Sequence, residues 1–168
     1  MKAANFGIGG DRTEHVLWRL DHGNFDGLKP KAIVLMIGTN NTGHQGRAQA
    51  ELDGAKYRVT PAQTAEGIKV IIGKLQEKCP TSKILLLAIF PRGATPEDSL
   101  RKQNEQVNAI IKGYADGKKV FFMDIGAKFL AADGSLSQEI MPDRLHLSEQ
   151  GYKIWAEAIE PKVKELMQ

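Results

Sequence analysis

The chain has 168 residues, a length that can bury a core in one domain without disulfides or metals. Its 42% hydrophobic and 26% charged residues are ordinary for a globular protein, and the net charge of +3 comes from Lys and Arg spread along the chain. This distribution of charge argues against nucleic acid as a partner. No apolar run approaches the roughly 18 residues that span a membrane, and a single cysteine, Cys79, excludes an internal disulfide.

Short apolar segments predict four strands, at about Lys2–Phe6, Ala32–Ile37, Ile84–Phe90 and Lys119–Met123. The middle two are continuously apolar rather than alternating, which is typical of strands buried on both faces of a parallel sheet.

Helical patterns lie between and after these segments, and each has a polar start signal. The predicted starts are Asp11–Glu14, Thr60–Gln63, Thr95–Asp98 and Ser148. The alternation of strand and helix predicts an α/β fold, a parallel sheet covered by helices in three α/β/α layers. The polar connection 41–59 is too long for a simple turn, and it begins where a candidate site motif ends, so we expect it to overhang the site.

Two polar turns follow the first two predicted strands. Gly7, Gly9 and Gly10 precede a helix start, and Gly38-Thr39-Asn40 follows the second strand. Backbone N–H groups at glycines and the Asn40 amide could stabilise an oxyanion at the carboxyl edge of the sheet. Tight turns without a ligand also explain these residues. A dinucleotide site is disfavoured, because the glycine spacing is not G-x-G-x-x-G.

Asp143 and His146 lie three residues apart in a polar turn before the last helix. A hydroxyl nucleophile needs a base, and the base needs a carboxylate that fixes its tautomer, which this pair could provide. An idle surface pair is the alternative. Metal binding is disfavoured, because the remaining histidines are scattered without ligand spacing.

These motifs together resemble the SGNH (GDSL) hydrolase superfamily, and within it esterases of the platelet-activating-factor acetylhydrolase alpha-subunit type. The matching stretches are Asn5–Leu20, Lys29–Asn41, Leu86–Gly93 and Asp143–Tyr152. The resemblance implies an SGNH-type, flavodoxin-like sheet over a single domain, residues 1–168, truncated at its N-terminus relative to the family. It also implies a serine esterase without a cofactor or metal, acting on a small acylated substrate, in particular an O-acetyl ester of a carbohydrate or lipid.

The resemblance assigns the catalytic base to His146 and its orienting acid to Asp143, with Gly10 and Asn40 as oxyanion donors. Arg12, Arg92 and the connection 41–59 are candidate substrate contacts. The Gly-Asp-Ser block that carries the family's nucleophile is missing. The five serines present follow no strand into a turn, so none is expected to replace it.

The missing block also includes a strand, which in the family lies between the strands predicted to end near Phe6 and Ile37. Its loss leaves unpaired backbone groups or a rearranged sheet. Truncation is the first explanation, and a strand from another chain, through a homodimer or strand exchange, is the second. The alternative function is an inactive fragment or pseudo-enzyme that binds partners through the open sheet edge.

Overall fold

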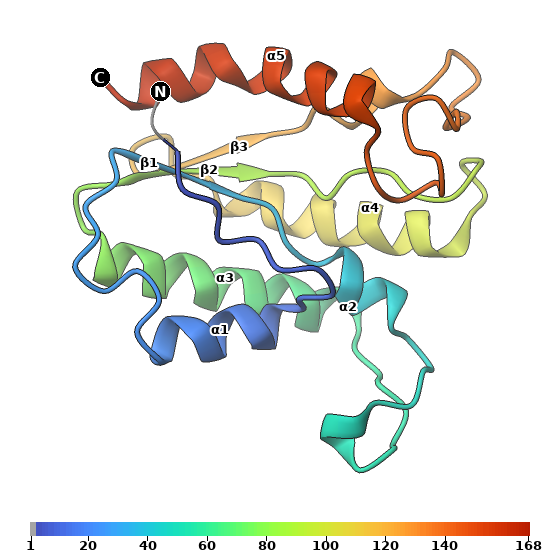
Figure 1. The fold of residues 1–168 in the computed structure, drawn as a ribbon, viewed down its shortest axis with the longest axis horizontal. Coiled ribbons are helices and arrows are strands. Elements are labelled where there is room, and N and C mark those ends of the chain that lie inside the picture. The colour runs from blue at the N-terminus through green and yellow to red at the C-terminus, as the bar shows by residue number, and fades with distance from the viewer. Residues whose placement is uncertain (1–2) are drawn as a thin grey trace.

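The computed structural model describes residues 3–168, in which three strands form one parallel sheet (Figure 1). The strands are β1 (Ala32–Leu35), β2 (Lys83–Leu87) and β3 (Val120–Met123), and they lie side by side in chain order. The register pairs Ile33 with Ile84 and Ile84 with Val120. The carboxyl ends of the strands therefore meet at one edge of the sheet.

Helices cover both faces of this sheet (Figure 1). The helices are α1 (Thr13–Asp21), α2 (Thr39–Gly43), α3 (Pro61–Lys78), α4 (Ser99–Ile111) and α5 (Glu149–Leu166). Short 3₁₀ turns occur at Ala50–Leu52, Lys112–Tyr114 and Gly126–Phe129. α1, α3 and α4 lie on one side of the sheet and α5 on the other, which gives the expected three layers.

The core follows the alternation of side chains along the strands. Ile84 and Leu86 of β2 pack into the cluster under α3 and α4, whereas Leu85 and Leu87 pack under α5. These four side chains are at most 1% exposed, which confirms for β2 the prediction of a strand buried on both faces. The same prediction is wrong for β1, where Val34 is exposed at the edge of the sheet. No helix in the described part of the chain is long and apolar enough to cross a membrane.

The predicted first strand, Lys2–Phe6, is wrong where the structure describes it. Lys2 lies outside the described residues, and residues 3–6 pair with no strand. The Phe6 ring instead packs on Phe25, with centroids 4.4 Å apart. The physical reason is the absent neighbour: without an intervening strand, the segment has no row of backbone groups to join. β1 is consequently the sheet edge, and Val34 on it is 39% exposed.

The start signals of α3 and α5 are confirmed. Thr60 Oγ1 accepts a hydrogen bond from the Gln63 N–H at 3.2 Å, and the Thr60 N–H donates to Gln63 Oε1 at 2.8 Å. Ser148 Oγ accepts from the Gly151 N–H at 3.2 Å. Both interactions satisfy N–H groups that the first turn of a helix leaves free.

The other two helices begin differently from the prediction. α4 starts after Asp98, whose Oδ1 accepts from the Leu100 and Arg101 N–H groups, each at 3.0 Å. α1 starts at Thr13, and the carboxylate of Asp11 binds the Arg19 side chain instead of capping the first turn. Both starts are still local: Asp98, the last residue of the predicted signal, caps α4, and at α1 the Arg12 N–H donates to His15 Nδ1 at 3.1 Å, one residue later than the predicted Asp11–Glu14 pair.

Candidate active site

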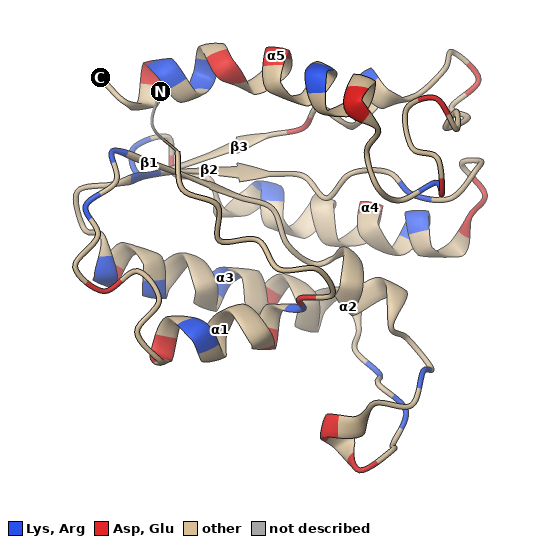
Figure 2. Cartoon of the chain, in the orientation of Figure 1, with Lys and Arg blue, Asp and Glu red and all other residues tan. Residues whose placement is uncertain are grey.

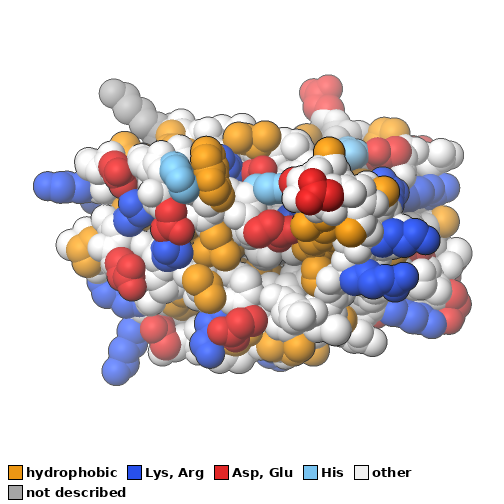
Figure 3. Space-filling model, turned by 90° about the horizontal axis from the view of Figure 1, so that it is seen from below, with side chains coloured by type: hydrophobic (Ala, Val, Ile, Leu, Met, Phe, Trp, Pro, Cys, Tyr) orange, Lys and Arg blue, Asp and Glu red, His pale blue; other side chains and the backbone are white. Residues whose placement is uncertain are grey.

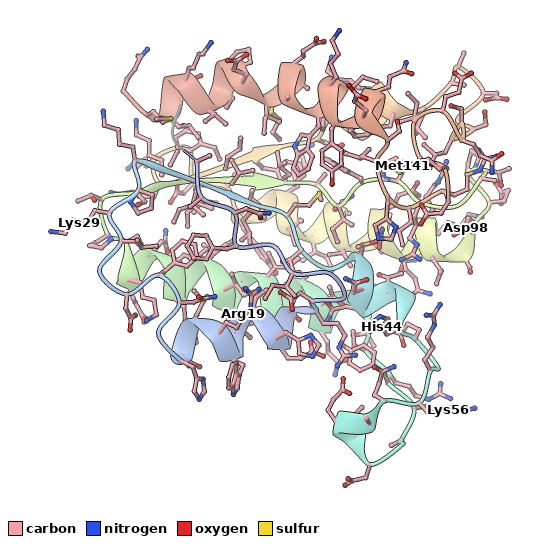
Figure 4. All side chains as sticks on the ribbon, viewed as in Figure 1. Arg19, Lys29, His44, Lys56, Asp98 and Met141 are labelled. Atoms are coloured by element: carbon pink, nitrogen blue, oxygen red, sulfur yellow. The ribbon has the colours of Figure 1, made fainter. Side chains whose placement is uncertain are left out.

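The glycine turn before α1 is held by Arg19. Its Nη1 donates to the Phe6 carbonyl at 2.8 Å, and its Nη2 binds the carboxylate of Asp11. Figure 4 shows Arg19 reaching from α1 toward the N-terminal segment. Gly10 has a φ of +83°, a conformation that residues with a Cβ adopt at a cost. The turn is therefore fixed at both ends, with exposed glycine backbone between them.

Asn40 of α2 reaches this turn. Its Nδ2 donates to the Asp11 carbonyl at 2.9 Å, across 29 residues of sequence. The structure thus brings together the two segments that the sequence predicted as oxyanion donors, Gly10 and Asn40. Because an Asn amide carries two N–H donors, one remains for a ligand.

Asp143 and His146 form the predicted pair. His146 Nδ1 lies 2.6 Å from Asp143 Oδ2, and Asp143 Oδ1 accepts from the N–H groups of His146 and Leu145 at 2.7 and 3.0 Å. The backbone N–H of His146, followed by its ring, lowers the pKa of Asp143 to about 2. The acid is therefore ionised at neutral pH, and the His146 side chain, 79% exposed, is open to a substrate.

Three of the described serines are hydrogen-bonded to backbone groups away from His146. The Ser148 hydroxyl donates to the Glu139 carbonyl at 2.6 Å, Ser82 binds the Pro30 carbonyl, and Ser137 accepts from the Ile140 N–H at 3.4 Å. Ser99 opens α4, and Ser135 lies in the loop before Asp143. No hydroxyl within residues 3–168 is hydrogen-bonded to the His146 ring.

Arg92 lies between the two halves of the candidate site. Its Nη1 donates to the Thr39 carbonyl at 2.9 Å, next to Asn40. The Gly93 N–H donates to the Arg144 carbonyl at 2.9 Å, inside the Asp143–His146 turn. Burial lowers the pKa of Arg92, which the nearby Asp98 partly opposes. A Cβ at Gly43 would lie 2.7 Å from Arg92 Nη1, so the glycine makes room for the guanidinium.

Arg12, in contrast, is 2% exposed, and protein groups surround its guanidinium. The partners are Glu14 Oε1 at 2.6 Å, Gln49 Oε1 at 2.9 Å, His44 Nδ1 at 3.0 Å, a carboxylate oxygen of Glu51, and the Tyr57 ring at 4.3 Å. Burial alone would lower the pKa of Arg12, but the two glutamates outweigh it and raise that pKa.

The connection 41–59, which we call the excursion, is held by these partners. Ala48 and Lys56 form an antiparallel bridge within it, and Asn41 Nδ2 donates to the Tyr57 hydroxyl at 2.8 Å. Figure 4 shows His44 near its base and Lys56 toward its far end. Figure 1 shows the excursion projecting from the body beyond α2, on the side away from α5.

A shallow hollow of about 350 Å³ opens beside the glycine turn. It is lined by Gly9, Gly10, Asp11, His15, Trp18 and Arg19. Trp18 is 61% exposed and stacks on the His22 ring at 4.1 Å. On the face seen in Figure 3, apolar and histidine side chains lie next to acidic ones. Figure 2 shows that both signs of charge are distributed over the helices.

Sequence reasoning missed three residues on the inner face of α4: Arg101, Asn104 and Asn108. All three bind backbone groups that follow β2. The sequence carries a signal for them. Asn104 and Asn108 fall at the helical spacing of Leu100, Val107 and Ile111, on the face of the helix that is expected to be apolar throughout.

Comparisons with known proteins match nearly the whole chain. The sequence profile of the GDSL-like Lipase/Acylhydrolase family matches residues 1–154. Platelet-activating factor acetylhydrolase IB subunit alpha1 of Homo sapiens is 39% identical over 153 residues, 90% of this chain and 59% of that protein. Subunit alpha2 of Rattus norvegicus is 36% identical over 169 residues, 100% of this chain and 67% of that protein. The chain thus spans about three fifths of the first of these relatives.

Solved structures share the fold. A GDSL-like lipase from Bacteroides thetaiotaomicron superposes with a TM-score of 0.73 at 20% identity, covering 95% of this chain and 74% of that one. Axe2, an acetylxylan esterase from Geobacillus stearothermophilus, gives 0.70 at 21% identity, covering 97% and 71%. At these identities the likeness concerns the fold alone.

Proposed function

The chain belongs to the GDSL-like lipase/acylhydrolase family, and we propose that it supplies the base, the orienting acid and the oxyanion donors of a serine ester hydrolase. The observation that carries this proposal is the hydrogen bond of 2.6 Å between His146 Nδ1 and Asp143 Oδ2. A carboxylate on Nδ1 holds the proton there and leaves Nε2 free to accept another.

The chemistry follows from this tautomer. A serine hydroxyl attacks the ester carbonyl while His146 Nε2 takes its proton, and a tetrahedral oxyanion forms. His146 then gives that proton to the departing alcohol as the carbon–oxygen bond breaks. Water repeats the two steps on the acyl-serine and releases the acid. Asp143, with a pKa of about 2, stays ionised and stabilises the imidazolium.

Gly10 and Asn40 are the proposed oxyanion donors. The Asn40 amide is anchored on the Asp11 carbonyl at 2.9 Å, which orients its second N–H without motion during the reaction. Gly10 offers its backbone N–H with no side chain in the way. Donors fixed in advance are worth about 10²–10³ in rate each, because they need no reorganisation.

The attacking serine is proposed to come from outside these 168 residues. The chain's serines cap a helix, bind carbonyls or lie in other segments, as described above. Its source is proposed to be the Gly-Asp-Ser block of the family pattern, which these residues do not include, or a strand from another polypeptide.

The substrate is proposed to be an O-acetyl ester of a carbohydrate or lipid. The names of the curated relatives support an acetyl ester, since both are acetylhydrolase subunits. Arg92, half-buried between Asn40 and the Asp143–His146 turn, is the proposed substrate contact. For Arg12 we propose a different role from direct contact, because its buried guanidinium already holds the excursion.

The test is hydrolysis of p-nitrophenyl acetate by this chain, with and without a small added alcohol. In the absence of a nucleophilic serine, His146 is expected to activate water or the alcohol. The alcohol should therefore raise the rate of ester cleavage, and this increase should depend on His146. His146→Ala should lower that rate about 10²-fold or more. His22→Ala is the matched control, because an exposed imidazole hydrolyses activated esters by itself.

The outcomes separate the alternatives. Equal rates in wild type, His146→Ala and His22→Ala would overturn the base assignment. An acetyl group found by mass spectrometry on a serine of this chain would overturn the external nucleophile.

A second candidate is a binding module without catalytic activity. The observation in its favour is the open edge of β1, where no strand of the described residues pairs and Val34 is 39% exposed. Such an edge can pair with another strand. Light scattering after size exclusion tests the homodimer or strand-exchange form, since a monomer at high concentration would count against it.

A further inference from the structure

The backbone beyond β2 has no strand partner, and α4 replaces that partner with side chains. The last ladder bond is from the Ala88 N–H to the Met123 carbonyl, at 3.0 Å. One residue later, Asn108 takes both groups of Ile89: its Oδ1 accepts from the N–H at 2.8 Å, and its Nδ2 donates to the carbonyl at 2.9 Å. Asn104 Nδ2 donates to the Phe90 carbonyl at 3.3 Å.

Arg101 completes this series, one turn toward the start of α4. Its Nε donates to the Arg92 carbonyl at 2.9 Å, its Nη2 to the Gly93 carbonyl at 2.8 Å, and its Nη1 to the Gly134 carbonyl at 2.7 Å. The side chain is 1% exposed, and no carboxylate of the described residues forms an ion pair with it. A buried guanidinium is thus satisfied by three carbonyl dipoles from two separate loops.

These two loops contact both halves of the candidate site. The first carries Arg92, whose Nη1 donates to the Thr39 carbonyl beside Asn40. It also carries Gly93, whose N–H donates to the Arg144 carbonyl at 2.9 Å. The second, around Gly134, precedes the Asp143–His146 turn, and the loops meet again where the Leu136 N–H donates to the Ala94 carbonyl at 3.0 Å.

We propose that Arg101 is a positioning residue that sets the Asp143–His146 turn relative to Asn40. The hydrogen bonds inside the turn fix the acid to the base, but they do not place the pair against the oxyanion donors. Contacts from Arg101 through Gly93 to Arg144, and from Arg92 to Thr39, link the pair to the donors, and Asn104 Nδ2 adds a long contact of 3.5 Å to Thr39 Oγ1. The value of this placement for catalysis rests on the function proposed above.

The chemistry explains why an arginine occupies this position. A guanidinium presents five N–H donors in a rigid planar fork, so it can bind three carbonyls that lie in different directions. A lysine ammonium at the end of a flexible stem cannot hold the same three in a fixed relation. Removing the charge altogether leaves three carbonyls without their donors in a buried place.

The experiment measures position by NMR and needs no turnover. Amide hydrogen exchange and residual dipolar couplings are recorded for the full chain and for Arg101→Met, Arg101→Lys and Asn108→Leu. The last variant is the matched control, because Asn108 lies on the same face of α4 but holds Ile89, not the loops bound by Arg101. Dipolar couplings report the orientation of the Arg144 and His146 N–H bonds relative to the sheet.

Arg101→Met should accelerate exchange at Gly93 and Leu136 about 10- to 100-fold and change the couplings of Arg144 and His146. Arg101→Lys should do the same to a smaller extent. Asn108→Leu should instead accelerate exchange at Ile89.

A purely structural role predicts equal acceleration at Leu86 in the core and unchanged couplings in the turn, and that result would overturn the proposal. If Arg101→Met does not fold, Arg101→Lys decides by the same criteria. Because neither readout uses an ester, failure of the esterase assay would leave this result standing, and the reverse also holds.

Discussion

Replacing Gly38 with alanine tests how the backbone before Asn40 is held. Gly38 has a φ of +125°, and a Cβ there would lie 2.7 Å from Ile89 Cδ1 and 3.2 Å from Thr64 Cγ2. The positive φ costs a residue with a Cβ about 1–3 kcal/mol. Overpacking against the buried Ile89 adds about 1–3 kcal/mol, toward the low end if its terminal methyl group shifts. We expect Gly38→Ala to lower the free energy of unfolding by about 2–6 kcal/mol.

Gly73→Ala is the matched control for this substitution. Gly73 lies inside α3, and a Cβ there would meet nothing within 4 Å. Alanine in a helix interior is more stable than glycine by about 0.5–1 kcal/mol, so the control should be more stable than wild type.

Urea unfolding followed by circular dichroism compares the two variants. A Gly38→Ala midpoint equal to that of wild type would refute the reasoning, because neither the backbone conformation nor the close contact would then exist. A destabilised Gly73→Ala would show instead that any added methyl group disturbs this layer.

Three further predictions concern the site and its supports. The carboxyl group of Asp143, followed by NMR through its side-chain carbon, should titrate near pH 2. The contribution of this ionised group to stability is therefore present above the usual pKa of 3.8 and is lost as the pH falls through 2. In His146→Ala the pKa of Asp143 should rise but stay below 3.8, because the backbone N–H of residue 146 still donates to Asp143 Oδ1. A pKa of 3.8 or above in the NMR titration would contradict this hydrogen bond. Arg12→Met should remove the contacts that hold the excursion, so limited proteolysis within residues 44–57 should accelerate about tenfold. An unchanged cleavage rate would show that Arg12 does not hold the excursion. Ser148→Ala should lower the free energy of unfolding by about 1 kcal/mol in the same urea assay, through the lost cap of α5.

Local signals predicted the features that depend on neighbouring residues. The apolar run of β2 was recognisable because both faces of a central parallel strand need hydrophobic side chains. The caps at Thr60 and Ser148 and the Asp143–His146 pair lie within three residues of their partners, so spacing alone was sufficient.

Features that depend on distant partners could not be predicted in this way. The segment before Gly7 has a strand-like composition, but pairing requires a neighbour that the described chain lacks. The sequence predicts Arg12 as a candidate substrate contact, and no sequence pattern joins it to Gln49, 37 residues away. Arg101 binds a carbonyl 33 residues away, and carbonyls are present at every residue, so they leave no mark in the sequence.

The chain order of the sheet has a consequence for biosynthesis. β1, β2 and β3 pair in the order in which a ribosome makes them, with α3 and α4 as the crossovers, so one face can assemble as synthesis proceeds. The opposite face waits for α5, which follows all three strands and covers Leu85 and Leu87. Until α5 emerges, part of this apolar face stays uncovered on the nascent chain, and transiently exposed surface of this kind is what chaperones protect from aggregation.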